Sequence, residues 1–354
     1  MQNKRPITMA DSINEAIQIA MKKDKSMLCY GLGTTDPKGI FGTTIGLEKK
    51  YGKERVFDVP ASENALTGVS VGLGINGIRS IVSHQRLDFF LLAMDQLVNS
   101  AAKWFFTYNK AIPITIRLIV GRGWGQGPTH AQNLHSWFAH IPGLKVVMPS
   151  NAYDAKGLLL SSIFDPNPVI FIENRWLHQS ISNVPKKPYF INLGKSKKKI
   201  SGKKITIISS SYLTAEAINA CKYLKKLNIN VDLIDLRTIA PLDWRNIKKS
   251  IKKTGSLLVL DSGHFSGSIA SEVIYKATNE CFQFLKKPPS KLCQPDIPEP
   301  SSFGLTKKFY ITYKEIINKV CKMLNCDKKL IKAELNYKKD FLHDIPNSNF
   351  KGPF

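Results

Sequence analysis

Glu63 is a carboxylate with a candidate chemical role. It lies between an apolar stretch (residues 56–59) and a segment rich in small residues (64–77). The first stretch has the β-branched and aromatic content of a buried strand, and the second is typical of a helix. Functional groups in open α/β sheets collect at the carboxyl ends of strands, where we expect Glu63. A carboxylate in dry surroundings is suited to proton transfer. The pattern also fits a structural role, with Ser62 as the helix N-cap and Glu63 as an acid favoured by the helix dipole.

Three histidines, His130, His135 and His140, follow a loop with four glycines at residues 121–127. Glycines at a strand end let the backbone approach an anionic or planar ligand. The spacing of five residues differs from the i, i+4 spacing of a helical metal pair, so no zinc site is expected. His130 is a candidate for proton transfer or for a hydrogen bond to substrate, with a structural role as the alternative. For the other two histidines the structural role is favoured.

A cation and a stripe of small residues are two further candidates. Arg86 follows a predicted strand and could bind a carboxylate or a phosphate, or could be an exposed cation. Ala65, Gly68 and Gly72 recur at helical spacing and line one face of the predicted helix. A glycine inside a helix costs up to about 1 kcal/mol relative to alanine, which usually reflects close approach of another backbone or a cofactor. Packing of the helix on a sheet within one subunit remains the alternative.

Alternating strands and helices position these residues. Residues 5–174 alternate between the two patterns, and the nearly wholly apolar stretch 111–121 is typical of a central parallel strand. A single long helix is predicted over 86–109, with Phe89 on its apolar stripe. A polar, lysine-rich linker follows, and the alternation then restarts. The fold class predicted is therefore α/β with two doubly wound domains. The expected boundaries are 1–180 for the first domain, 181–203 for the linker, 204–325 for the second domain and 326–354 for a basic tail.

Composition restricts the class of protein. The chain has 354 residues, of which 43% are hydrophobic and 22% charged, as in soluble globular proteins. No run of 18 apolar residues and no signal peptide is present, so a cytoplasmic location without membrane contact is expected. The six cysteines show no CxxC and are expected to be reduced thiols. The net charge of +24 comes without a nucleic-acid-binding motif, so we expect no nucleic acid. An acidic partner, an anionic substrate or a general compositional bias would explain it.

The order of several motifs resembles a known family. The motifs are DFFLLAMDQLVNSAAK, THAQ, HIPGLKVVMPSNAYDAKGLL, DPNPVIFIEN and IDLRTIAPLD. In this order they resemble the β subunit of the pyruvate-type 2-oxoacid dehydrogenase E1 component, in the transketolase-like thiamine diphosphate superfamily. The resemblance is collinear over about residues 5–322. It implies a pyrimidine-binding domain followed by a transketolase C-terminal-type domain.

The resemblance also implies a cofactor, thiamine diphosphate, shared between two subunits. The β chain holds the aminopyrimidine, and the α chain holds the diphosphate and Mg²⁺. Glu63 matches the glutamate that bonds the pyrimidine N1′, Phe89 matches the aromatic residue on the pyrimidine face, and His130 matches the active-site histidine. Asp165 and Asn167 fall where some members bind a monovalent cation such as K⁺. The chain has no GDG motif at diphosphate-site spacing, so it is expected to need its α partner to bind the cofactor.

The function implied is that of an E1 β subunit in an α₂β₂ heterotetramer. Such an enzyme decarboxylates a 2-oxoacid and passes the acyl group to the lipoyl group of an E2 acyltransferase. A transketolase-like decarboxylase or carboligase without lipoyl transfer is one alternative, and a non-catalytic partner subunit is another. Leu32 stands where the family usually has an acidic residue, which removes one charge near the cofactor, and Arg86 replaces a residue that is commonly less polar. Arg86 and His130 are the candidate substrate contacts.

Overall fold

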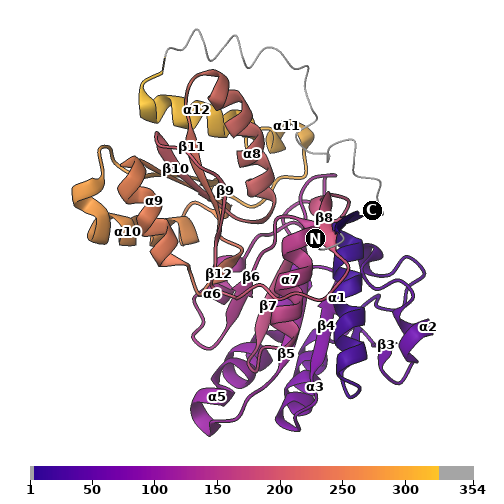
Figure 1. Ribbon diagram of the computed structural model, residues 1–354. Coiled ribbons are helices and arrows are strands. Elements are labelled where there is room, and N and C mark those ends of the chain that lie inside the picture. The colour runs from indigo at the N-terminus through magenta and orange to yellow at the C-terminus, as the bar shows by residue number, and fades with distance from the viewer. Residues whose placement is uncertain (1–3, 327–354) are drawn as a thin grey trace. The chain divides into compact units, whose positions relative to one another are not determined.

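The computed structural model describes residues 4–326, which divide into two compact units (Figure 1). The first unit contains residues 4–121 and 137–193, and the second contains 122–136 and 194–326. The basic tail expected at 326–354 lies outside the described residues apart from its first residue. Among the described residues, no helix combines the length and the apolar character needed to cross a membrane.

Six parallel strands form the sheet of the first unit, in the order β6-β7-β5-β4-β2-β3. They are β2 (Leu28–Gly31), β3 (Val56–Asp58), β4 (Ser80–His84), β5 (Ile114–Val120), β6 (Lys145–Val147) and β7 (Val169–Asn174). Every residue of β5 is buried, as its apolar sequence predicts for an interior strand. Because the strands are parallel, their carboxyl ends lie along one edge of the sheet, where functional groups are expected.

The helices of the first unit differ in how they begin. They include α1 (Met9–Lys23), α2 (Leu47–Tyr51), α3 (Glu63–Ile75) and α7 (Ala152–Ile163), and the short α6 (His135–Ala139) begins in residues of the second unit and ends in the first. Thr8 accepts from the backbone of Asp11, whose side chain accepts in return from the backbone of Thr8, so α1 begins at a capping box. Asn151 caps α7 through Asp154 N at 3.0 Å. Helices α1 and α7 pack side by side.

The prediction of one regular helix over residues 86–109 is wrong, because the segment is helical but irregular. The segment contains a short α4 (Leu87–Phe90), a 3₁₀ turn (Leu91–Ala93), a π-helical stretch (Gln96–Ala101) and α5 (Ala102–Tyr108). Tight and wide turns shift the helical phase, so Phe90 enters the core and Phe89 stays half-buried. The predicted apolar stripe therefore holds only from Ala93 onward.

An antiparallel pair that the sequence does not reveal joins the ends of the first unit. Strand β1 (Lys4–Thr8) pairs with β8 (Ile181–Pro185), which lies in the stretch expected as linker. Beneath it the fully buried Lys156 donates to Glu15 Oε2 at 3.0 Å and to Pro185 O at 2.6 Å. A buried ammonium needs such acceptors, so Lys156 ties α7 to both ends of the unit.

The second unit is a five-stranded sheet in the order β14-β13-β10-β11-β9, with β9 antiparallel to the others. Its strands are β9 (Lys197–Ile200), β10 (Ile205–Ser209), β11 (Val231–Asp235), β13 (Leu257–His264) and β14 (Ser290–Gln294). Its main helices are α8 (Ser211–Lys226), α9 (Trp244–Thr254), α10 (Ile269–Cys281) and α12 (Tyr313–Leu324).

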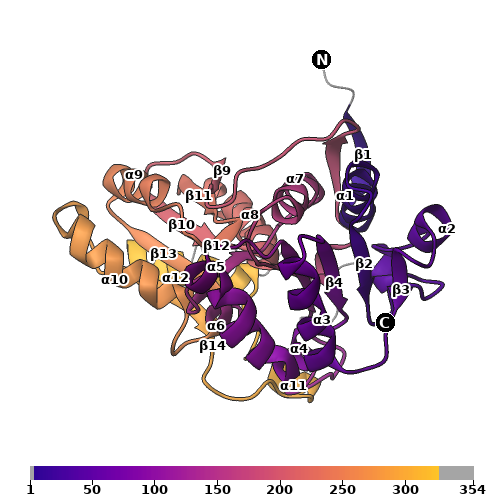
Figure 2. The ribbon, with the colours of Figure 1, turned by 90° about the horizontal axis from the view of Figure 1, so that it is seen from below.

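Helices cover both faces of this second sheet (Figure 2). Ile205 and Ile207 of β10 pack in one apolar cluster with residues of α8 and α12. Thr206, which points to the other face, bonds Ser250 and Thr254 of α9 at 2.7 Å each. The alternation along β10 confirms the prediction of a second doubly wound α/β domain.

Candidate active site

Glu63 is the first residue of α3 and lies just beyond strand β3, as the sequence predicts. Its side chain is buried, with 8% of the residue exposed. Ser62 makes no side-chain capping hydrogen bond, so the alternative role as a conventional N-cap pair lacks its main contact. Within residues 4–326 no hydrogen bond or ion pair to the Glu63 carboxylate is present. A carboxylate without a protein donor at such a position can accept a hydrogen bond from water, a ligand or a partner.

Within residues 4–326 the small-residue face of α3 is open rather than packed against other elements. Ala65, Val69 and Gly72 are exposed, Val69 by 56%. A Cβ added at Gly72 would meet nothing within 4 Å, whereas one at Gly68 would lie 3.5 Å from the Gln96 side chain. Other residues of α3 pack against the core of the first unit. The face therefore remains available to another subunit.

Arg86 immediately precedes the short helix α4, and Phe89 lies within this helix, which packs against α3. Both side chains are half-buried, while the neighbouring Phe90 is buried. Phe90 contacts the ring of His84 edge-on, with centroids 4.8 Å apart. Burial lowers the pKa of His84 to about 3, so its ring is neutral at physiological pH. In the described part of the chain neither of its ring nitrogens has a hydrogen-bond partner.

His130 belongs to the second unit, in a loop (residues 122–136) that packs on the C-terminal domain. Its Nδ1 lies 2.9 Å from the Thr129 hydroxyl oxygen. The loop is fixed at its start by Arg122, whose guanidinium lies 4.6 Å from the ring centroids of both Tyr212 and Tyr310. The Gly123 amide also donates to the Tyr310 hydroxyl at 3.0 Å. These contacts hold the glycine-rich loop in one conformation.

A buried pair fixes the other end of the same loop. His135 Nε2 lies 2.7 Å from Asp261 Oδ1, and both residues are buried. Asp261 also accepts from the amides of Gly263 and Ala270, at 2.8 and 3.1 Å. Burial acts to raise the pKa of Asp261, but His135 and the two amides keep it below its ordinary value. His135 is thus structural, as the sequence favours, while His140 is exposed.

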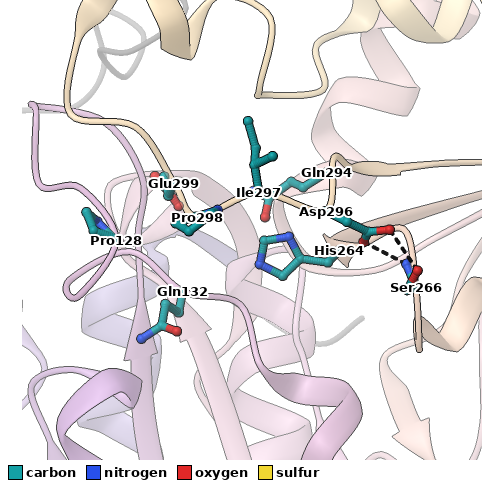
Figure 3. Close-up of a pocket in the computed structure, with 9 residues that line it drawn as sticks. All are labelled: Pro128, Gln132, His264, Ser266, Gln294, Asp296, Ile297, Pro298 and Glu299. Atoms are coloured by element: carbon teal, nitrogen blue, oxygen red, sulfur yellow. Dashed lines mark hydrogen bonds between the residues drawn. The ribbon is translucent and has the colours of Figure 1, made fainter.

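A cavity of about 570 Å³ lies in the second unit beside the loop of His130 (Figure 3). Pro128 and Gln132 of that loop line one side, and the His264 ring extends toward them from the end of β13. His264 Nδ1 lies 2.8 Å from the Pro295 carbonyl oxygen, so this nitrogen carries a proton and donates to the carbonyl. Asp296 accepts from the hydroxyl of Ser266 at 2.7 Å. The sequence patterns did not single out this cavity.

Asp165 and Asn167, the candidate cation ligands, lie in a turn between α7 and β7. The Asp165 carboxylate accepts from Lys145 Nζ at 2.6 and 2.8 Å and from the Asn167 amide at 2.9 Å. Arg79 donates to the backbone oxygen of Ile163 at 2.7 Å. Lys145 thus neutralises the Asp165 carboxylate, which makes this group less suited to bind a monovalent cation. Asn167 Oδ1 is buried without a partner among the described residues.

The structure distributes the candidate residues over both units. Glu63, Arg86 and Phe89 belong to the first unit, and His130 belongs to the second. No group of three or more His, Cys, Asp or Glu side chains within residues 4–326 is placed to hold a metal ion.

The sequence reasoning missed a buried charge network in the first unit. Arg117 and Glu173 form a two-point ion pair at 2.6 and 2.9 Å, and neither side chain is exposed. His178 Nε2 lies 3.0 Å from the second oxygen of Glu173. Burial acts to raise the pKa of Glu173, but Arg117 and His178 lower it to about 2. Charged residues inside otherwise apolar strands were the available signal.

Comparison with known proteins places both units in one family. The family described as "Transketolase, pyrimidine binding domain" matches residues 5–179, and "Transketolase, C-terminal domain" matches residues 194–316. The pyruvate dehydrogenase E1 component subunit beta of Acholeplasma laidlawii is 38% identical over 304 residues, which covers 84% of this chain and 92% of the relative. Its Bacillus subtilis counterpart is 35% identical over 299 residues, with the same coverage of 84% and 92%.

Two more distant comparisons extend the picture. An acetoin:2,6-dichlorophenolindophenol oxidoreductase subunit beta of Bacillus subtilis is 33% identical over 334 residues, which covers 90% of this chain and 98% of the relative. A solved structure titled "Split gene transketolase, inactive beta4 tetramer" superposes with a TM-score of 0.73 at 20% identity, over 91% of this chain and 99% of that chain, which shows the shared fold. The chain belongs to the family of pyruvate dehydrogenase E1 component β subunits, built from the two transketolase-type domains.

Proposed function

We propose that the chain forms the β-subunit half of a thiamine diphosphate site in a pyruvate-type 2-oxoacid dehydrogenase E1. Family membership makes thiamine diphosphate the cofactor of the complex. The relatives named pyruvate dehydrogenase support pyruvate as the substrate and an E1 α subunit as the partner. The acyl group would pass to a lipoyl group of an E2 acyltransferase. A lipoyl-domain acylation assay separates this function from that of a carboligase.

The observation that carries the proposal is the buried Glu63 carboxylate at the start of α3. Its environment fits the cofactor, because a carboxylate that lacks a donor among residues 4–326 can accept from the protonated nitrogen of an aminopyrimidine. When bound, thiamine diphosphate supplies the electron sink that decarboxylation of a 2-oxoacid requires. Glu63 would hold a proton at N1′ of the pyrimidine and so favour the activated form of the ring.

Two further side chains would complete this chain's contribution. Phe89 is half-buried on α4, which packs against α3, and would lie on the face of the pyrimidine. His130, oriented by the Thr129 hydroxyl at 2.9 Å, would hold or move a proton on the substrate. These roles stay proposals that mutagenesis must test.

The remaining requirements fall on partners. Mg²⁺ and the diphosphate would be held by the α subunit, since the sequence has no GDG motif. The exposed face of α3 that includes Ala65, Val69 and Gly72 is the proposed contact surface in an α₂β₂ tetramer. The side chains do not support a K⁺ site at residues 165–167, because Lys145 already forms an ion pair with the carboxylate of Asp165.

The test is Glu63→Gln in the complex reconstituted with the α partner. The amide keeps the size of the side chain and removes its charge, so exchange of the cofactor C2 proton for deuterium should slow by about 10²- to 10⁴-fold. Glu54→Gln, an exposed glutamate of the same unit, is the matched control. Exchange at the wild-type rate in Glu63→Gln would leave Glu63 with only a structural role and remove the basis of the proposal.

A binding experiment tests the shared nature of the site without turnover. Calorimetry on the isolated chain should show weak or no binding of thiamine diphosphate with Mg²⁺, and addition of the α partner should restore it. Tight, Mg²⁺-dependent binding by the isolated chain would contradict the division of the site between two subunits.

A further inference from the structure

Helix α12 carries one cysteine in its last turn and is followed by a second. The helix packs beside α8 on the apolar cluster that covers one face of the second sheet (Figure 1). Cys321 belongs to the last turn of α12 and is 1% exposed, whereas Cys326 lies just beyond the helix and is half-buried. Both are free cysteines. One end of this helix thus holds two thiols, one in the core and one within reach of solvent.

The way in which α12 ends brings the two cysteines together. Asn325 has a left-handed backbone with φ of 56°, as in a Schellman motif. The Cys326 amide donates to the Cys321 carbonyl oxygen at 2.9 Å, which is the defining hydrogen bond of that motif. Through this bond the two Cα atoms are at most about 7 Å apart, and the bond angles along the path shorten the separation. Disulfides bridge Cα atoms about 4.4–6.8 Å apart.

The two thiol groups also contact each other. They share a hydrogen bond, and Cys326 packs on the same apolar cluster that contains Cys321. Burial, together with the neighbouring Cys326, raises the pKa of Cys321 to about 12. Cys321 therefore remains a protonated thiol at neutral pH, and Cys326 is the member of the pair that an oxidant in solution can reach.

The charges at this end of α12 permit a reaction at Cys326. A helix C-terminus carries partial negative charge, which disfavours a thiolate. Lys287 donates to the backbone oxygen of Met323 at 2.7 Å, so an ammonium group lies at the helix end and offsets that charge. A nearby lysine favours the thiolate form of a cysteine, which is the form that attacks an oxidant.

The other four cysteines differ from this pair. Cys29, Cys221 and Cys281 are buried. Cys293 of β14 is half-buried like Cys326, but its thiol donates to the Ser268 hydroxyl at 3.6 Å. Cys293 is therefore a thiol of similar exposure in the same unit with a hydroxyl as its neighbour, which makes it a suitable control.

We propose that Cys321 and Cys326 form a reversible disulfide, a redox modification site that fastens Cys326 to the last turn of α12. The Cys326 thiolate first attacks hydrogen peroxide, which forms a sulfenic acid and releases hydroxide. The Cys321 thiol then attacks the sulfenic sulfur, which forms the S–S bond and releases water. Overall, two thiols are oxidised to a disulfide and one peroxide is reduced to two waters. A dithiol reverses the step by thiol–disulfide exchange. The inference is independent of the proposed function.

The test treats the full chain with hydrogen peroxide and then alkylates the remaining thiols under denaturing conditions. Two of the six thiols should be protected, and dithiothreitol should restore both. After trypsin digestion, mass spectrometry should find the peptide 320–322 linked to the peptide 323–328 with the loss of two hydrogens. Full alkylation of both cysteines would overturn the inference. So would a link from Cys326 to another cysteine, or its conversion to a sulfinic acid without a link.

Substitutions assign the two sulfurs. Cys326→Ser should abolish the link and leave Cys321 open to alkylation, and Cys293→Ser should leave the link unchanged. Cys321→Ser should leave Cys326 to oxidise further to a sulfinic acid, because no second thiol is present to attack the sulfenic sulfur. Protection of two thiols in Cys326→Ser would contradict the assignment. The peptide map of the wild type decides the matter even if Cys321→Ser, at a buried position, fails to fold.

Hydrogen exchange tests whether the disulfide fixes the helix end. Amides in the last turn of α12 should exchange at least about 10-fold more slowly in the oxidised wild type than in the reduced one, because the bond restricts local opening. Cys326→Ser treated with peroxide should show no slowing. Equal exchange in the oxidised and reduced wild type would overturn the proposed fastening of Cys326 to α12.

Discussion

The two units bury their charges in different ways. In the first unit Arg117 and Glu173 join β5 to β7 through two hydrogen bonds, and neither side chain is exposed. In the second unit His135 and Asp261 join the start of α6 to β13, and through it the loop of His130 to the C-terminal sheet. The first pair connects neighbouring strands of one sheet and serves the fold. The second connects the loop of His130 to the C-terminal sheet, and we expect it to position this candidate residue.

The buried histidines sharpen this contrast. His84 in the first unit is fully buried against Phe90 with its pKa lowered to about 3, so it acts as an aromatic core residue. His135 in the second unit shares its Nε2 with a carboxylate at 2.7 Å. The same residue type therefore contributes packing in one unit and a polar link in the other, because only one of them faces an acid.

The largest expected effect is on the ion pair of the first unit. Arg117→Met leaves Glu173 as a buried charge with only His178 beside it, which should lower the free energy of unfolding by about 3–5 kcal/mol. Hydrogen exchange followed by mass spectrometry should show faster exchange in peptides from β5 and β7, with peptides from β10 and β11 little changed. Arg245→Met, at an exposed residue of α9, should change neither set. Equal loosening of both units would contradict the separate stability that the comparison assigns to them.

A smaller loss is expected at the corresponding pair of the second unit. Asp261→Asn removes the charge that faces His135 and should cost about 1–3 kcal/mol, the range for a buried hydrogen bond to a charged group. In the reconstituted complex the steps after substrate addition should slow, while exchange of the cofactor C2 proton stays near the wild-type rate. Asp296→Asn, at an exposed aspartate of the same unit, is the control. Normal late steps in Asp261→Asn would show that the pair does not position His130.

The buried His84 predicts a response of the first unit to mild acid. Its folded-state pKa of about 3 lies below the ordinary 6.5, so below pH 6.5 the unfolded chain binds the proton more readily than the folded one. The stability that His84 provides is therefore present above pH 6.5 and is lost as the pH falls toward 3. At pH 5 the loss should be about 2 kcal/mol, at 1.36 kcal/mol per pH unit. His84→Phe should remove this part of the difference in unfolding free energy between pH 7 and pH 5.

Glu173 adds to the same acid response at lower pH. Its pKa of about 2 lies below the ordinary 4.5, so its contribution is complete above pH 4.5 and is lost as the pH falls through 2. The two groups thus act in the same direction in different pH windows. A His84→Phe chain with wild-type acid sensitivity between pH 7 and pH 5 would show that another group is responsible.

The smallest expected effect on the chain itself is at the open face of α3. Gly72→Leu meets no atom within 4 Å, so stability of the isolated chain should change by less than about 1 kcal/mol, the difference in helix propensity. Assembly with the α partner should weaken, because overpacking a contact costs about 1–3 kcal/mol. Native mass spectrometry of the co-purified proteins would measure this. If the Gly72→Leu variant still forms an intact tetramer, the interface must lie on another surface of the chain.

The sequence by itself determined the elements whose signals are local. The apolar strand β5 was predicted, because an apolar run identifies a buried strand. Glu63 at the start of α3 followed from the same local pattern. The family motifs extended these predictions to the two domain types. The regular helix over 86–109 failed, because turn width within a helix depends on what packs against it.

Only the tertiary structure decided which distant residues meet. Strand β1 pairs with β8 at the far end of the first domain, and His135 meets Asp261 across 126 residues. A single sequence carries no local trace of such contacts, since each depends on strand order and on side chains that approach one another only after the sheet has formed.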